Sequence, residues 1–163
     1  MSAIELYLIR HGIAAEHGIY PKDSERPLTD EGQEKTRQVA QRLYELDIRF
    51  DLIQTSPLVR ARQTANILQS AGLGQSLEES SHLAPEGSFE DWVSWLRSWK
   101  GEKLAIVGHE PNLGEWTERL VWGSVHHQIV VKKAAVIGLL LPETGSPAGK
   151  SQLFWLTPPR LLL

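Results

Sequence analysis

The sequence contains no cysteine, and this absence excludes a whole group of functions. A chain of 163 residues without a thiol cannot form disulfides, bind zinc through thiolates or use a cysteine nucleophile. A strongly basic segment is also missing, because the net charge is −3 and the Lys and Arg residues are scattered along the chain. We therefore expect no nucleic-acid partner.

Long hydrophobic runs are absent as well. The longest apolar run, 134–141, is far shorter than the roughly 20 residues that a membrane-spanning helix needs. The first residues lack the basic stretch and apolar core of a signal peptide, so we expect a cytoplasmic protein without membrane contact. With 41% hydrophobic and 23% charged residues, the composition is that of an ordinary globular protein, and the length fits a single domain over 1–163.

Short apolar segments alternate along the chain with segments of helical periodicity. The predicted strands are 4–9, 51–55, 103–107, 134–141 and 152–156, with a short extended piece at 75–78. Four helices are predicted, over 30–46, 57–71, 88–99 and 111–122. Thr29 or Asp30 caps the first, Ser56 caps the second with Pro57 in its first turn, and Ser88 with Asp91 opens the third. This order predicts an α/β fold, a three-layer sandwich with a mostly parallel central sheet flanked by helices, in which the last two strands are antiparallel.

Polar motifs directly follow three of the predicted strands: RHG at 10–12, TSP at 55–57 and GHE at 108–110. The ligand crevice of such a sheet lies at the carboxyl ends of its strands. We therefore expect four side chains to meet there: Arg10, His11, Arg60 and His109. Two guanidiniums and two imidazoles beside a helix N-terminus form an anion site that suits phosphate. His11 is the predicted nucleophile, provided that a hydrogen bond holds its other ring nitrogen.

Four motifs carry a family resemblance: RHG, RPLTDEG at 26–32, TSPLVRARQTA at 55–65 and GHEPN at 108–112. They resemble the histidine phosphatase superfamily, which has the phosphoglycerate mutase-like fold, and the GHEPN form in a short chain is similar to its SixA-type phosphohistidine phosphatases. The resemblance implies that His11 becomes phosphorylated, that Arg10 and Arg60 bind the phosphoryl group, and that His109 donates a hydrogen bond to it. It also implies that Arg26 lies near the pocket, and it implies no metal and no cofactor.

The chain departs from the wider superfamily in segment 82–92, HLAPEGSFEDW, where many members carry a general acid. Glu86 and Asp23 are the candidate proton donors. The absence of a clear acid favours a leaving group that needs little protonation, and imidazole, with a pKa of roughly 6.5, is one. The expected substrate is phosphohistidine of a signalling or phosphotransfer protein, such as a histidine-phosphotransfer domain. The alternatives are a small phosphomonoester and a non-catalytic phosphoprotein-binding module, whereas a mutase would need lid segments that this chain has little room for.

Three further features have two interpretations each. Trp92, Trp95 and Trp99 recur at helical spacing and fit a packing face better than a stacking platform for a ligand. His126 and His127 are weak metal ligands, because adjacent residues point apart on a strand and no carboxylate cluster adjoins them. The C-terminal PPRLLL packs on its own chain or docks to a partner.

Overall fold

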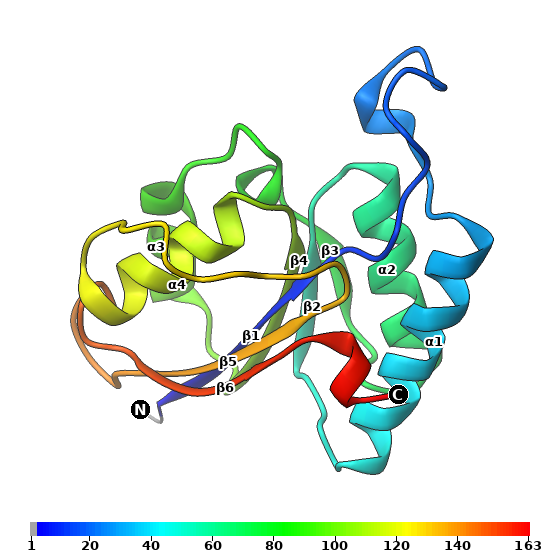
Figure 1. Cartoon of the computed structure of the whole chain (residues 1–163). Coiled ribbons are helices and arrows are strands. Elements are labelled where there is room, and N and C mark those ends of the chain that lie inside the picture. The colour runs from blue at the N-terminus through cyan, green and yellow to red at the C-terminus, as the bar shows by residue number, and fades with distance from the viewer. Residues whose placement is uncertain (1–2) are drawn as a thin grey trace.

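A six-stranded sheet lies at the centre of the computed structural model, which describes residues 3–163. The strands follow the order β3-β2-β4-β1-β5-β6 (Figure 1). Their bounds are β1 (Ile4–Arg10), β2 (Leu52–Thr55), β3 (Leu77–Glu79), β4 (Lys103–Gly108), β5 (Val136–Leu141) and β6 (Gln152–Thr157). The first four pair in parallel, while β5 runs antiparallel to β1 and to β6. The predicted sheet, including its antiparallel last strands, is confirmed.

Four helices cover the two faces of this sheet: α1 (Asp30–Glu45), α2 (Val59–Ser70), α3 (Phe89–Ser98) and α4 (Asn112–Trp122). Figure 1 shows α1 and α2 on one side of the sheet and α3 and α4 on the other. Alternate residues of β1 enter the two cores, with Leu6 and Leu8 facing α3 and α4, and Tyr7 and Ile9 facing α1 and α2. The predicted three-layer sandwich is therefore confirmed.

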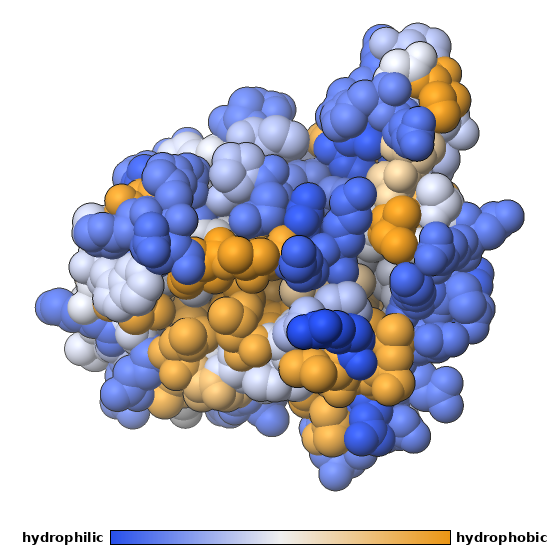
Figure 2. Space-filling view, viewed as in Figure 1, coloured by the Kyte–Doolittle hydropathy of each residue, from blue (hydrophilic) through white to orange (hydrophobic). Residues whose placement is uncertain are grey.

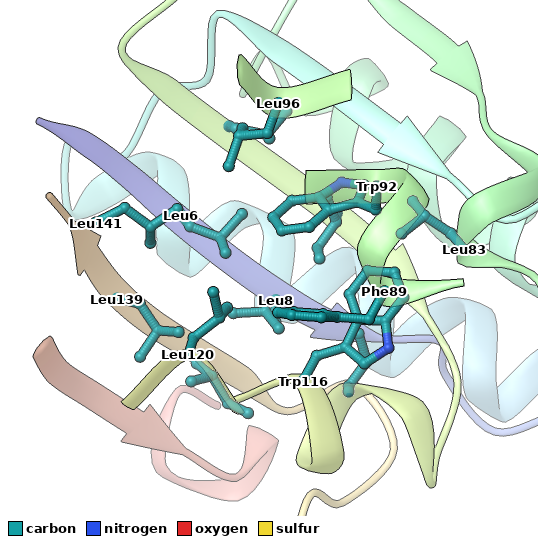
Figure 3. Close-up of a cluster of buried hydrophobic side chains, with 14 of the residues drawn as sticks. Leu6, Leu8, Leu83, Phe89, Trp92, Leu96, Trp116, Leu120, Leu139 and Leu141 are labelled. Carbon is teal, nitrogen blue, oxygen red and sulfur yellow. The ribbon is translucent and has the colours of Figure 1, made fainter. Parts of the chain in front are cut away.

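The core under α3 and α4 is rich in aromatic side chains (Figure 3). Trp92 is fully buried there, and its Nε1 donates a hydrogen bond to Gln54 Oε1 at 3.1 Å. Trp95 and Trp99 stack on each other and pack at the margin of the same cluster. The tryptophan stripe is thus a packing face, as its spacing predicts.

The helix starts show where local signals decide the structure. Thr29 Oγ1 accepts from the Gly32 N–H at the start of α1, and Ser88 caps α3 through the Asp91 N–H, so both predicted caps are confirmed. The expectation for α2 is wrong, because α2 begins at Val59 rather than at Pro57. The Ser56 hydroxyl does not cap this helix and instead accepts from the Leu58 N–H and bonds to His109 Nε2.

Most other boundaries differ by a residue or two from the predicted ones, including β3, predicted at 75–78 and found at Leu77–Glu79, and two of the differences lie beside the polar motifs. The helix α4 begins at Asn112 and not at 111. The strand β5 begins at Val136 rather than at 134, because Ala134 has a left-handed backbone conformation with φ of 63°. That conformation directs the Ala134 N–H to the carbonyl oxygens of Arg10 and His11 instead of into a strand ladder.

The C-terminal segment packs on its own chain. Leu162 is buried in the core under α1 and α2, while its neighbours Leu161 and Leu163 are exposed. Figure 2 shows hydrophobic residues gathered over the region of the edge strand β6 and this segment. Leu153 and Phe154 of β6 are half-exposed. None of the helices within residues 3–163 has the length and apolar character required to cross a membrane.

Candidate active site

The register of the parallel strands brings the three polar motifs to one edge of the sheet. Arg10 lies opposite Gly108 on the neighbouring strand, and the His11 N–H donates to the Gly108 carbonyl at 3.1 Å. On the other side of β4, the Ser56 N–H donates to the Val107 carbonyl at 3.0 Å. The imidazole centroids of His11 and His109 are consequently 5.2 Å apart, although the two residues are far apart in sequence.

His11 is buried and held in one tautomer. Its Nδ1 lies 2.7 Å from the carbonyl oxygen of Gly12, and because a carbonyl oxygen only accepts, Nδ1 carries the proton. The other ring nitrogen, Nε2, is therefore unprotonated, and its lone pair accepts a hydrogen bond from Arg60 Nε at 3.3 Å. Burial, opposed by the backbone hydrogen bond, lowers the pKa of His11 to about 3. At neutral pH the ring is uncharged, and its Nε2 has the electron pair that a nucleophile needs.

Gly12 permits the close packing that fixes this turn. A β-carbon at this position would clash with the hydroxyl of Thr36 on α1. The Gly12 N–H donates to Thr64 Oγ1 at 3.1 Å, and Thr64 in turn donates to the Arg60 carbonyl. The RHG turn thus packs closely against α1 at Thr36 and is hydrogen-bonded to α2 at Thr64.

Arg60 extends from the first turn of α2 into the site and is only 5% exposed. Its Nη1 donates to the Asp23 carbonyl oxygen at 2.9 Å and its Nη2 to Asp23 Oδ2 at 3.1 Å. The other carboxylate oxygen of Asp23 accepts from Arg26 Nε at 2.8 Å, and Arg26 also donates to the Ala15 carbonyl at 2.6 Å. Asp23 therefore bridges the two arginines. Arg60 contacts His11 directly, whereas Arg26 is connected to Arg60 only through Asp23.

Asp23 is ionised in this arrangement. Desolvation acts to raise its pKa, but the hydrogen bonds from Arg26 and Arg60 outweigh it and lower the pKa below the ordinary value. A carboxylate in this state has no proton to donate at neutral pH. The role of proton donor for Asp23 stays a prediction, and the geometry makes this residue a partner of the two arginines.

Arg10 approaches the site from the opposite side. Its Nη1 donates to the carbonyl oxygen of Val131 at 2.8 Å, across a sequence separation of 121 residues. Its Nε is buried and has no hydrogen-bond partner within residues 3–163. Burial lowers the pKa of Arg10 below its ordinary value, yet a guanidinium stays charged at neutral pH.

His109 is the second buried histidine and is only 3% exposed. Its Nε2 lies 2.8 Å from Ser56 Oγ, and its Nδ1 has no hydrogen-bond partner in the described part of the chain. Burial, with the nearby charge of Arg60, lowers the pKa of His109 to about 4. A buried polar atom without a partner costs free energy. The unpaired atoms of Arg10 and His109 both belong to side chains placed around His11.

Sequence reasoning did not single out Glu110, the residue after His109 in the GHEPN motif. This carboxyl is half-buried, and its Oε1 accepts from the Gly114 N–H at 2.6 Å. Burial raises its pKa, against the opposing effects of that hydrogen bond and of the Arg10 charge. Its position beside a candidate site histidine is the sequence signal that could have drawn attention to it.

Glu86, the other candidate proton donor, is exposed, and its side chain has no hydrogen-bond partner in the described part of the chain. Its segment is tied to α4 through Asn112 Nδ2, which donates to the carbonyls of Ala84 and Pro85. No contact of residues 3–163 joins the Glu86 side chain to either site histidine, so its role as a proton donor also stays a prediction.

The histidine pair 126–127 lies in a loop after α4, rather than on a strand as the sequence reasoning assumed. Both side chains are exposed, and the two backbone N–H groups donate to Glu118. Over residues 3–163, no group of three or more His, Cys, Asp or Glu side chains is close enough together to hold a metal ion.

Comparisons with known proteins show the family and the fold of this chain. Residues 6–96 match the family model of the histidine phosphatase superfamily (branch 1). An uncharacterised protein of Picosynechococcus is 46% identical over 98% of this chain and 99% of that protein. Phosphohistidine phosphatase SixA of Escherichia coli is 26% identical over 88% of this chain and 89% of that protein. A structure of the protein histidine phosphatase SixA with tungstate superposes with a TM-score of 0.84 at 24% identity, covering 98% of this chain and 100% of that one.

The fold and the family together define a phosphatase, so an enzyme is favoured over a non-catalytic binding module. The chain belongs to the histidine phosphatase superfamily. The resemblance to the SixA type, which the four sequence motifs indicated, extends over nearly the whole chain in both sequence and fold.

Proposed function

We propose that this phosphatase removes phosphate from phosphohistidine in a cytoplasmic signalling or phosphotransfer protein, through a phosphohistidine intermediate on His11. The state of His11 is the observation that carries the proposal. Its proton is held on Nδ1 by the Gly12 carbonyl, so Nε2 is unprotonated and can attack once the Arg60 donor that it accepts from turns to the phosphoryl group. The similarity to a phosphohistidine phosphatase of Escherichia coli supports the choice of substrate.

In the first step, His11 Nε2 attacks the phosphorus atom of the substrate. A new N–P bond forms as the P–N bond to the substrate imidazole breaks, and the electron pair of the broken bond leaves with that imidazole. When its second nitrogen is protonated, the substrate ring departs as neutral imidazole and needs no general acid. Arg10 and Arg60 hold the phosphoryl oxygens and offset the charge of the transition state.

In the second step, a water molecule attacks the phosphorylated His11. An O–P bond forms, the N–P bond breaks, and the electron pair returns to Nε2 while the proton of the water passes to the phosphate or to solvent. The products are inorganic phosphate and the original tautomer of His11, which the Gly12 carbonyl keeps in place.

His109 serves as a hydrogen-bond donor to the phosphoryl group in this proposal. The Ser56 hydroxyl accepts from the Leu58 N–H at 3.2 Å and is therefore free to donate its own proton to His109 Nε2. That arrangement leaves a proton on His109 Nδ1, the buried atom without a partner. Arg10 Nε is likewise a buried donor without a partner, so a bound phosphoryl group would satisfy two buried donors at once.

A small phosphomonoester is the second candidate substrate, and Glu110 is the observation that favours it. An alkoxide leaving group needs a proton in the transition state. Glu110 adjoins His109, interacts with the charge of Arg10 and has a pKa raised by burial, as a general acid requires. Asp23, by contrast, is held ionised by two arginines.

The test compares two substrates and two variants. The purified protein is incubated between pH 5 and 8 with a chemically phosphorylated histidine-phosphotransfer protein and, separately, with phosphoserine, whose alkoxide leaving group needs a proton. Wild type should remove the phosphate from histidine, and His11→Asn, which lacks the nucleophile but keeps a similar volume, should not. Glu110→Gln should retain the activity on phosphohistidine.

The second candidate is supported if wild type hydrolyses only phosphoserine and Glu110→Gln abolishes that hydrolysis. Absence of any phosphate release from either substrate by wild type would refute both candidates. Acid-labile labelling of wild type, but not of His11→Asn, by a phosphorylated substrate would identify His11 as the phosphorylated residue.

A further inference from the structure

Glu118 on α4 takes no part in the steps above, yet it is a buried carboxylate, with only 1% of the residue exposed. It accepts hydrogen bonds from three consecutive backbone N–H groups. Those of His126 and His127 donate to Oε1 at 3.3 and 2.8 Å, and that of Gln128 donates to Oε2 at 3.0 Å. Burial alone would raise its pKa, but these three bonds lower it below the ordinary value. Glu118 is therefore an ionised group that binds the main chain.

The segment 124–134, which these bonds anchor, connects α4 to β5 without a helix or strand of its own. His127 lies in the left-handed region with φ of 55°. Successive N–H groups around such a residue converge and form a concave anion site, or nest. The carboxylate of Glu118 fills this nest, so a side chain of α4 determines the path of an otherwise irregular segment.

The far end of the same segment contacts two candidate site residues. The Val131 carbonyl accepts from Arg10 Nη1 at 2.8 Å, and Val131 itself is buried in the core under α3 and α4. The Ala134 N–H donates to the carbonyl oxygens of Arg10 and His11, each at 3.1 Å. One segment therefore holds both the guanidinium of Arg10 and the backbone of the RHG turn.

We propose that Glu118 is a positioning residue for phosphoryl binding, which acts by anchoring segment 124–134 so that the Val131 carbonyl orients the Arg10 guanidinium. This inference rests on the proposed role of Arg10 in the phosphatase reaction. Arg60 takes its orientation from Asp23 on a different segment. Loss of the Glu118 anchor should therefore disturb the function of Arg10 and leave that of Arg60 in place.

The test uses Glu118→Gln, in which an NH₂ group replaces one carboxylate oxygen and cannot accept from a backbone N–H. Thr117→Ala is the matched control, because Thr117 is fully buried on the same helix and donates only to the Leu113 carbonyl within it. The measurements are the hydrolysis of p-nitrophenyl phosphate, the inhibition constant of inorganic phosphate and the melting temperature. Glu118→Gln should weaken phosphate inhibition about 10-fold, whereas Thr117→Ala should change it little.

A double-mutant cycle separates positioning from a general loss of stability. In an Arg10→Ala background, Glu118→Gln should have no further effect on phosphate binding, measured by calorimetric titration with inorganic phosphate. Full additivity of the two changes, or an effect of Glu118→Gln no larger than that of Thr117→Ala, would overturn the inference. If Glu118→Gln does not fold, Glu118→Asp provides the same comparison, with an effect on phosphate binding expected in the same direction.

Failure of the positioning role of Glu118 can be distinguished from failure of the proposed function. If wild type binds no phosphate and hydrolyses neither substrate, the proposed function fails. If wild type and Thr117→Ala are active and Glu118→Gln matches them, only the positioning role of Glu118 fails.

Discussion

The two sides of the candidate site are held by different means. On one side, segment 13–27 projects from the body of the protein (Figure 1), residues 16–25 are exposed, and Asp23 in this part pairs with Arg60 and Arg26. On the other side, segment 124–134 lies against α4 and β1, and its Val131 carbonyl holds Arg10. A charged and exposed group orients one arginine, and a buried main-chain group orients the other.

The contacts that orient the two arginines differ in whether a bound phosphoryl group could replace them. The Asp23 side chain is 49% exposed and carries a negative charge, so under the proposed function it would compete with phosphate for the donors of Arg60. Because Asp23 is half-exposed, water can take over its hydrogen bonds when another anion binds the buried Arg60. The Val131 carbonyl is neutral and buried, so it directs Arg10 without occupying the anion site. One side of the site is thus exchangeable and the other is fixed.

The largest expected effect comes from removing either arginine. Arg60→Ala and Arg10→Ala should each lower kcat for p-nitrophenyl phosphate by about 10²–10³-fold, because each loses a charged donor to the transferred phosphoryl group. Arg62→Ala is the control, since Arg62 is half-exposed on the same helix and pairs with Glu79. Activity of Arg60→Ala equal to that of Arg62→Ala would contradict the assignment of Arg60 to the site.

An intermediate effect is expected for stability in acid. The folded-state pKa values of His11 and His109 are lowered to about 3 and about 4, whereas the unfolded chain titrates near 6.5. Between these values the unfolded state binds more protons, so the free energy of unfolding falls as the pH falls below about 6.5. From pH 7.5 to 5.0, His11 alone accounts for a loss of about 2 kcal/mol.

Urea unfolding at pH 7.5 and 5.0 measures this loss. His11→Asn should lose about 2 kcal/mol less than wild type over the interval, because its side chain does not titrate. Asp23→Asn tests the exchangeable side of the site. Its free energy of unfolding should change with pH as that of wild type does, because the lowered pKa leaves Asp23 ionised throughout this range. Equal pH dependence in wild type and His11→Asn would show that burial of His11 does not oppose its protonation.

The smallest effect is expected for Asp23 itself. Asp23→Asn removes the charge that competes for Arg60, so inorganic phosphate should inhibit the variant up to about fivefold more strongly than wild type. Glu25→Gln is the control, because Glu25 is exposed in the same short turn and forms no ion pair within residues 3–163. Weaker inhibition of Asp23→Asn would mean that the orientation of Arg60 by Asp23 outweighs any competition with phosphate.

Most of the fold and much of the site could be predicted because the signals are local. Apolar segments such as 4–9 and 103–107 are too short for anything but buried strands, and parallel pairing then brings the motifs at their ends to one edge. The start of α2 could not be predicted in this way. Ser56 is a good cap by local rules, but its hydroxyl bonds to His109, which is 53 residues away.

The contacts that orient the two arginines also lay beyond prediction. Asp23 was a candidate proton donor in the sequence, and its pairing with Arg60 depends on how the exposed segment folds back over a separation of 37 residues. The burial of Glu118 could not be predicted, because a single Glu in an amphipathic helix is ordinarily a solvated residue. Segment 124–134 has neither periodicity nor a motif that would identify what it holds.

The sequence by itself determined the α/β architecture, the family and the meeting of His11 with His109, because these follow from strand length, helical periodicity and motifs placed at strand ends. Only the tertiary structure decided the tautomer of His11, the ionised state of Asp23 and the anchoring of segment 124–134 by Glu118. Those features depend on distances of a few ångströms between residues distant in sequence. Hydrogen bonds and pKa values respond to such distances, whereas patterns of residue type do not record them.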